Sequence, residues 1–181
     1  MNRCEYVNLK NPAYIAYHDE EWGRPLHDDR ALFELLILEC FQAGLSWECV
    51  LNKREAFRCA YEGFEPDVVA TFDEAKVEAL LADPGIIRNR LKVQASIGNA
   101  QAFLQIQREF GTFDAYLWGF TEGQVLHIDY HQETSSPLSD AISKDLKRRG
   151  MKFVGTTVMY SYLQATGVIN AHSSACDLYE G

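Results

Sequence analysis

The stretch of sequence that decides the fold is LKRRGMKFVGTT, residues 146–157. Its order predicts a helix, a tight turn and a second helix, because Gly150 and Gly155 bracket the turn. Thr156 follows the second glycine and is expected to cap the next helix, whose first backbone N–H groups have no partner inside the helix. We therefore expect a helix-hairpin-helix over residues of about 140–167.

The hairpin is basic although the chain is acidic. Residues 144–152 hold five basic side chains and one acidic one, a local balance of +4 in a chain whose formal net charge is −9. Amides at a helix start, glycines that allow close approach and nearby positive charge are what such a hairpin needs to hold a DNA phosphate. The alternative is an ordinary turn with solvated lysines, but the paired glycines and the local charge favour phosphate. The residues expected to contact the DNA backbone are Arg149, Gly150, Lys152, Gly155 and Thr156.

Composition sets the broad class of the protein. Apolar residues make up 47% of the 181 residues, enough for a sizeable core, and no apolar run is long enough to cross a membrane. The N-terminus is polar and lacks the apolar stretch of a signal peptide, so we expect a cytoplasmic protein. The sequence carries no signal for oligomeric state, and a monomer is the default expectation. The acidic charge alone argues against a nucleic-acid partner, but phosphate binding depends on local basic patches.

Helical spacing of apolar residues runs through most of the sequence and predicts an all-α fold, one compact unit over residues 1–181. The first expected helix is capped by Asp28 or Asp29 and ended by Gly44. A second is capped by Ser46 and has Val50, Leu51 and Phe57 on its inner face. Short helices open at Pro66 and Asp73, and longer ones are expected at about 89–110, 139–149 and 156–166. Residues 125–128 alternate in a way that fits either a short strand or a loop.

Cysteine and histidine residues occur near both ends of the chain. Cys4 and His18 lie near the start, while His172 and Cys176 lie near the end, one turn apart if that segment is helical. A Cys₂His₂ set is enough for tetrahedral zinc, but spacing alone favours four unrelated residues. Two observations favour the hypothesis of a metal site. The termini are otherwise weakly anchored, and the other three cysteines fall in apolar helical patterns where core thiols are expected. Four protein ligands would leave no position for water, so such a zinc site would be structural.

Glu39 is the most informative single residue. It shares one helix face with Leu32, Leu35 and Leu36, so a carboxylate lies on a stripe that should be buried. A buried carboxylate needs a partner or a purpose, and for a lone Glu the alternative is a structural ion pair or a helix-end contact. Trp47 follows closely, and residues 12–23 are rich in aromatics. Aromatic rings beside one carboxylate suit a flat, cationic ligand that forms hydrogen bonds.

Several motifs carry a resemblance to a known family. They are YIAYHDEEWG at 14–23, QAGLSW at 42–47, GIIR at 85–88, IGNA at 97–100, RGMKFVGTT at 149–157, and then Gln164-Ala165. Together these stretches resemble the 3-methyladenine DNA glycosylase I family. The matches run in the family's order from Cys4 to Cys176, which is nearly the whole chain.

This resemblance implies a fold and a set of site residues. It implies a helix-hairpin-helix glycosylase fold with a second helical lobe that carries both termini. It implies a structural zinc ion on Cys4, His18, His172 and Cys176. It implies that Glu39 and Trp47 contact an extruded base in a pocket lined by Tyr14, Tyr17, Trp22 and Tyr6, the last where a Trp is common. Ala171 replaces a common Asp beside the kept His172, so zinc binding is expected to survive.

The resemblance also implies an activity. The family removes 3-methyladenine from alkylated double-stranded DNA, and Glu39 would bind the cationic base and support its hydrolysis. Related glycosylases place a catalytic Asp after the second hairpin helix, but this family lacks it, and residues 167–172 offer none. No lysine nucleophile is evident, so we expect a monofunctional hydrolase without lyase activity. Two alternatives from other classes are a non-catalytic DNA-binding module and a zinc-stabilised helical protein with no DNA role.

Overall fold

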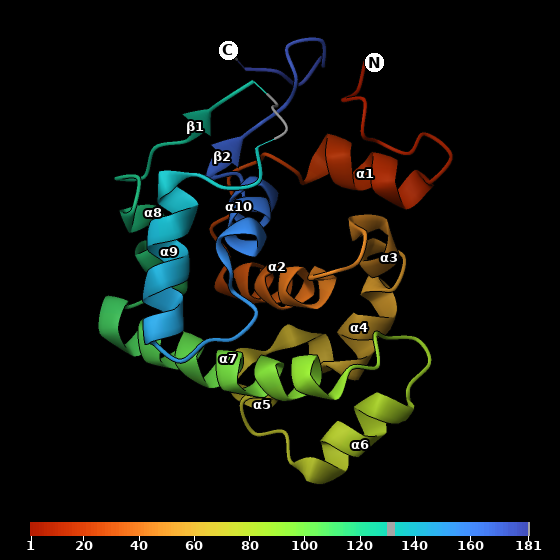
Figure 1. Cartoon of the computed structure of the whole chain (residues 1–181), viewed down its shortest axis with the longest axis vertical. Helices are drawn as coiled ribbons and strands as arrows, with labels where there is room; N and C mark the ends of the chain where they lie inside the picture. The colour runs from red at the N-terminus through yellow and green to blue at the C-terminus, as the bar shows by residue number, and fades with distance from the viewer. Residues whose placement is uncertain (130–132, 181) are drawn as a thin grey trace.

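The computed structural model describes residues 1–129 and 133–180, and within them ten α-helices account for most of the ordered structure. Helix α2 (Asp29–Gln42) lies at the centre of the molecule (Figure 1). All ten residues from Leu32 to Phe41 are buried. A helix buried on every side must be surrounded by other elements. Those that pack on α2 are α3 (Trp47–Leu51), α7 (Arg90–Phe110), α8 (Phe113–Gly119), α10 (Thr156–Ala165) and the 3₁₀-helix η1 (Glu62–Phe64).

Local sequence signals set most helix starts. The side chain of Asp28 accepts a hydrogen bond from the N–H of Ala31, so this residue caps α2. Ser46 caps α3 through the N–H of Cys49, as expected. The expected single helix from Ser46 to Phe57 is wrong, because the chain turns after Leu51 and restarts as α4 (Arg54–Ala60). At this turn the Asn52 side chain accepts a hydrogen bond from Asn11, which holds it toward α1 (Pro12–Glu20).

The expected hairpin is present as α9 (Pro137–Arg148), a turn, and α10. Helix α9 starts earlier than expected because Ser136 and Ser139 form a capping box around Pro137. Gly150 has φ +93°, a conformation that favours glycine, and ends α9 sharply. The prediction that Thr156 caps α10 is wrong. Gly155 occupies the cap position, and the Thr156 hydroxyl instead meets the Ser139 hydroxyl at 2.7 Å.

The remaining helices cover the outside of this core. Helix α7 runs beneath α2 in Figure 1, and α6 lies at the far edge of the molecule. Helices α5 and α6 both pack on α7. The bounds of the outer helices are Pro66–Val69 for α5 and Glu74–Ala82 for α6.

Both termini lie at the same end of the molecule, with the N-terminal segment next to α1 and the C-terminal segment on the side of β2 (Figure 1). There, β1 (Leu126–His127) pairs in parallel with β2 (Ile169–Asn170), so the segment that could have been strand or loop is a two-residue strand. The backbone N–H of Asp177 donates to the carbonyl of Asn2, which ties the two ends together. No helix among the described residues is long and apolar enough to cross a membrane.

Candidate active site

One pocket gathers the residues predicted to form a base-binding site. It lies between α1, α2, α3 and α10, and Glu39 and all five predicted aromatic residues line it. The full lining consists of Tyr6, Tyr14, Tyr17, His18, Trp22, Glu39, Gln42, Trp47, Ser161 and Gln164. Its volume is about 150 Å³, similar to a cavity that binds benzene. The pocket therefore suits one planar ring system.

The Glu39 carboxyl is the only acidic group on the wall of this pocket in the described part of the chain. Its residue is 4% exposed, and no described residue forms an ion pair or hydrogen bond with it. Burial raises the pKa of Glu39 to about 8, because no neighbouring charge offsets the loss of water. The alternative of a structural ion pair is therefore wrong. A buried acid without a partner is a candidate for a functional group.

Aromatic rings form the walls beside Glu39. The rings of Tyr17 and Trp47 lie 5.1 Å apart between centroids and are tilted by 46°. Tyr6 meets Trp22 edge-on at 5.3 Å. The indole N–H of Trp47 is buried and has no hydrogen-bond partner among the described residues. Electron-rich ring faces and one acid favour a flat ligand that carries positive charge.

The sequence reasoning did not assign Gln42, Ser161 or Gln164 to the pocket. Gln42 is three residues after Glu39, so helical spacing places it on the same side of α2. Its amide donates to the carbonyl of Leu45 and holds the corner between α2 and α3. Ser161 and Gln164 have the same three-residue spacing on α10. That spacing was a usable signal, although polar helix residues are more often solvent-exposed.

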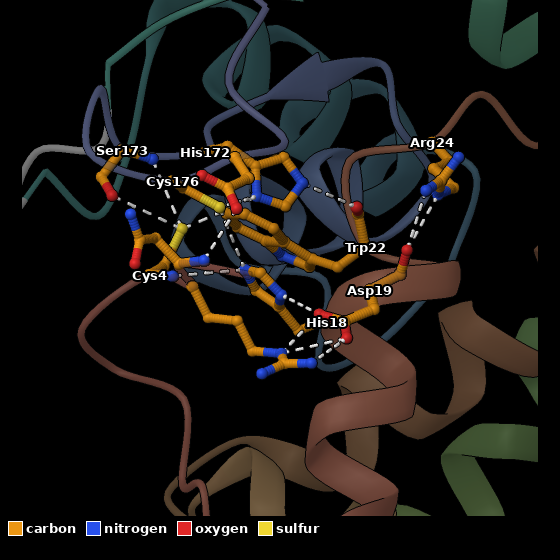
Figure 2. A network of polar contacts seen from close by, with 11 residues as sticks. Cys4, His18, Asp19, Trp22, Arg24, His172, Ser173 and Cys176 are labelled. Atoms are coloured by element: carbon orange, nitrogen blue, oxygen red, sulfur yellow. Dashed lines mark hydrogen bonds and ion pairs between the residues drawn. The ribbon is translucent and has the colours of Figure 1, made fainter.

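The four predicted metal ligands come together at the termini (Figure 2). Cys4, His18, His172 and Cys176 are all buried, and their ligand atoms lie within 4.8 Å of one another. His172 Nδ1 is 3.6 Å from the sulfur of Cys4 and 3.6 Å from that of Cys176. His18 Nε2 is 3.8 Å from the sulfur of Cys176. His172 and Cys176 lie in an irregular segment, residues 171–180, rather than on a helix.

The three distances between sulfur and nitrogen ligands fit a tetrahedral ion. Bonds of about 2.3 Å to sulfur and about 2.0 Å to nitrogen would place sulfur and nitrogen ligands about 3.5 Å apart. Burial opposes ionisation of Cys4, but hydrogen bonds with His172, His18 and Ser173 lower the pKa of its thiol to about 4. The thiolate is the form that binds metal. The donor set could therefore hold a metal ion.

Outer contacts orient both histidines. His18 Nδ1 lies 2.8 Å from Asp19, which is itself paired with Arg3, and this leaves Nε2 for the cluster. His172 Nε2 lies 3.2 Å from the carbonyl of Trp22, and this leaves Nδ1 for the cluster (Figure 2). Such contacts fix the tautomer and ring orientation of metal-binding histidines. Because Trp22 also lines the pocket, the cluster helps to hold a pocket wall in place.

The hairpin departs from expectation at Arg149. This side chain pairs with Glu109 at 2.6 Å and Asp145 at 2.7 Å, and it lies over the rings of Phe110 and Tyr116. The charge of Arg149 is thus already compensated by two acids, and its expected contact with the DNA backbone stays a prediction. Lys152 is exposed, and no side chain caps the first amides of α10.

The remaining cysteines are only partly as expected. Cys40 is a buried thiol of α2, as a core position should be, and Cys49 is half-buried. Cys59 is exposed, so the expectation of a core thiol there is wrong.

Comparisons with known proteins agree over nearly the whole chain. The methyladenine glycosylase family matches residues 7–179. DNA-3-methyladenine glycosylase 1 of Escherichia coli (strain K12) is 49% identical over 185 residues, covering 100% of this chain and 98% of that protein. A crystal structure of 3-methyladenine DNA glycosylase I superposes with a TM-score of 0.94 at 46% identity, covering 99% of this chain and 100% of that one. A structure of 3-methyladenine DNA glycosylase I from Staphylococcus aureus, which addresses 3-methyladenine recognition, superposes with a TM-score of 0.94 at 37% identity. The match covers 100% of this chain and 98% of that one.

Proposed function

Because the chain belongs to the methyladenine glycosylase family, it is a DNA glycosylase of base excision repair, and we propose that it removes 3-methyladenine from alkylated duplex DNA. The observation that carries the proposal is Glu39, a buried acid without a partner on the wall of a ring-lined pocket. A base that carries a positive charge would supply the missing partner. A neutral adenine would not.

Chemistry on a base inside a duplex requires that the nucleotide be flipped out of the stack. In the proposed complex the flipped base lies against Trp47, and Glu39 accepts hydrogen bonds from its edge. Tyr6, Tyr14, Tyr17 and Trp22 add ring contacts and attraction for the cation. These roles rest on the residues that line the pocket and on the family relationship.

Hydrolysis of this substrate needs modest help from the protein. When the bond between C1′ and the base nitrogen breaks, its electron pair neutralises the charged ring, so the base departs as a neutral molecule. Water adds its oxygen to C1′ and gives up a proton to the solvent. Glu39 favours the charged substrate over the neutral base, and this selects alkylated adenine. No lysine lines the pocket in the described part of the chain, which supports a monofunctional reaction without a Schiff base.

We propose that the hairpin holds DNA phosphates. The first amides of α10 lack a side-chain cap, and Gly155 leaves them open to a close approach by an anion. Lys152 and Gly150 are exposed beside them. Since Arg149 is compensated by two acids, we assign it to holding the hairpin together rather than to a strong phosphate contact.

We propose that zinc is the ion of the four-residue cluster and that its role is structural. All four positions of a tetrahedral site would be filled by protein atoms, so the ion would tie the two termini together without entering the reaction. Protein purified without chelator should contain one zinc per chain, and a strong chelator should lower the melting temperature. Absence of metal, or an unchanged melting temperature after complete removal, would contradict this role. A cytoplasmic location, a monomeric state and a single domain over residues 1–181 stay predictions.

The proposed activity is tested by base release. Methylated duplex DNA is incubated with wild type and with Glu39→Gln, and free bases are separated by chromatography. Wild type should release 3-methyladenine, and the variant should release it at least about tenfold more slowly, since an amide cannot stabilise the cation as a carboxylate does. A protein that binds DNA without releasing a base, or that binds no DNA, would support one of the two non-enzymatic alternatives.

A further inference from the structure

One face of α7 carries three buried polar side chains in a position where apolar residues would be expected. Lys92, Ser96 and Asn99 are spaced four and three residues apart, so they share that face, and they are 8%, 2% and 0% exposed. Buried polar groups are costly unless they are hydrogen-bonded. Ser96 bonds to Tyr61 and to the carbonyl of Val93, which keeps it within the core. The other two reach the two parts of the proposed active site.

Lys92 holds the corner where α2 gives way to α3. Its ammonium group donates to the carbonyls of Phe41 at 2.8 Å and Ala43 at 2.6 Å. These carbonyls belong to the end of α2, where backbone acceptors lack helical partners and the helix dipole favours a cation. No carboxylate among the described residues pairs with Lys92. The short segment that follows Ala43 leads directly to Trp47, so Lys92 fixes the distance between the Glu39 and Trp47 walls of the pocket.

Asn99 holds the hairpin turn by both of its amide atoms. Its oxygen accepts from the backbone N–H of Lys152 at 2.8 Å, and its nitrogen donates to the carbonyl of the same residue at 2.9 Å. The Asn99 amide also lies 3.6 Å from the sulfur of Cys40 on α2, next to Glu39. This side chain therefore sets where the proposed phosphate hairpin lies relative to the pocket.

We propose that α7 is the positioning element of the enzyme, with Lys92 setting the base pocket and Asn99 setting the phosphate hairpin. The inference rests on the proposed function, because it assigns one residue to each of the two proposed binding surfaces. Neither residue lines the base pocket. If the bonds only stabilised the fold, both residues would affect both surfaces in proportion to the stability lost.

The test measures two affinities for each variant. Free 3-methyladenine reports on the pocket through tryptophan fluorescence, and undamaged duplex DNA reports on the hairpin through fluorescence anisotropy. Lys92→Met keeps an unbranched side chain but removes the donors, and Asn99→Leu keeps a similar volume without hydrogen bonds. Ser96→Ala, on the same face between them, is the matched control for lost stability. The melting temperature is recorded for every sample.

Each variant should weaken one affinity. Lys92→Met should raise the dissociation constant for free 3-methyladenine about tenfold, equivalent to about 1.4 kcal/mol, and leave that for undamaged DNA within about twofold. Asn99→Leu should raise the dissociation constant for undamaged DNA about tenfold and leave that for free 3-methyladenine within about twofold. Lys92→Arg keeps N–H donors and should recover most of the base affinity. If Lys92→Met does not fold, Lys92→Gln, which is shorter and uncharged, takes its place and should weaken the same affinity.

Two results would overturn the inference. One is that both variants weaken both affinities together, as a loss of stability alone would do. The other is that both affinities stay at the level of Ser96→Ala. If wild type itself binds neither ligand, the proposed function fails. If wild type binds both and the variants are not selective, only the role of α7 fails.

Discussion

Replacing Glu39 by Gln should make the protein more stable at neutral and alkaline pH while it weakens base release. The raised pKa of about 8 means that the folded protein holds a proton that the unfolded chain, with an ordinary value of 4.5, gives up. Unfolding therefore releases that proton between these two pH values. It follows that the stability of wild type falls as the pH rises through this window and levels off above it.

The size of the effect follows from the two pKa values. Each unit of difference is worth about 1.4 kcal/mol, so wild type loses about 1 kcal/mol by pH 5, about 3 kcal/mol by pH 7 and about 5 kcal/mol by pH 9. The Gln variant resembles the protonated acid and has no such loss. At pH 7 its melting temperature should exceed that of wild type by about 6–12 °C, the shift expected for about 3 kcal/mol in a domain of this size. A functional group that lowers stability in this way is common at binding sites.

The assay is urea unfolding of both proteins near pH 5, 7 and 9, with the difference in unfolding free energy followed against pH. Glu34→Gln is the matched control on the same helix. Glu34 is paired with Arg54 and Arg58, which hold its pKa below the ordinary value despite burial. Its contribution to stability is present at neutral pH and is lost as the pH falls, so this variant should be destabilised most at neutral pH. A Glu39→Gln difference that does not change with pH would show that Glu39 is ionised and paired in the folded protein.

Three further substitutions test other parts of the structure. Trp47→Ala should weaken binding of free 3-methyladenine by about 10- to 100-fold, since stacking of a base on an aromatic ring is worth about 1–3 kcal/mol. The affinity is measured by titration calorimetry, because the substitution removes a fluorescent residue. An unchanged affinity would show that Trp47 does not contact the base. Lys152→Ala should keep the fold, because only the backbone of Lys152 holds the hairpin. It should lower the slope of log affinity for DNA against log salt concentration by about 1. An unchanged slope would show that this side chain contacts no phosphate. Gly167→Ala should destabilise the protein by about 3 kcal/mol or more, because Gly167 has φ +71° and an added Cβ would lie 2.1 Å from the carbonyl carbon of Arg24; a melting temperature equal to that of wild type would contradict this packing.

The central features could be predicted where local spacing sets them. The burial of Glu39 followed from one helix, since residues three, four and seven apart share a face and their neighbours were leucines. The hairpin likewise followed from two glycines and the helical patterns beside them. In both places the structure agrees because a short segment carries the information.

Other features depend on residues that are distant in sequence. Arg149 counts as part of a basic cluster in the sequence, but Glu109, forty residues earlier, takes up its charge. The four metal ligands occupy the two ends of the chain, so spacing alone favoured unrelated residues, and the resemblance was needed to join them. The Thr156 prediction failed because Ser139, on the preceding helix, competes for its hydroxyl. Polar residues inside the fold, such as Lys92 and Asn99, show their role only when the helices are packed.

The most direct test of the pocket is a crystal structure of the protein soaked with free 3-methyladenine. The base should occupy the cavity between α1, α2, α3 and α10, with its ring against Trp47 and its edge within hydrogen-bond distance of the Glu39 carboxyl. A base bound elsewhere, or an empty cavity beside Glu39 at a saturating concentration, would contradict the proposed site.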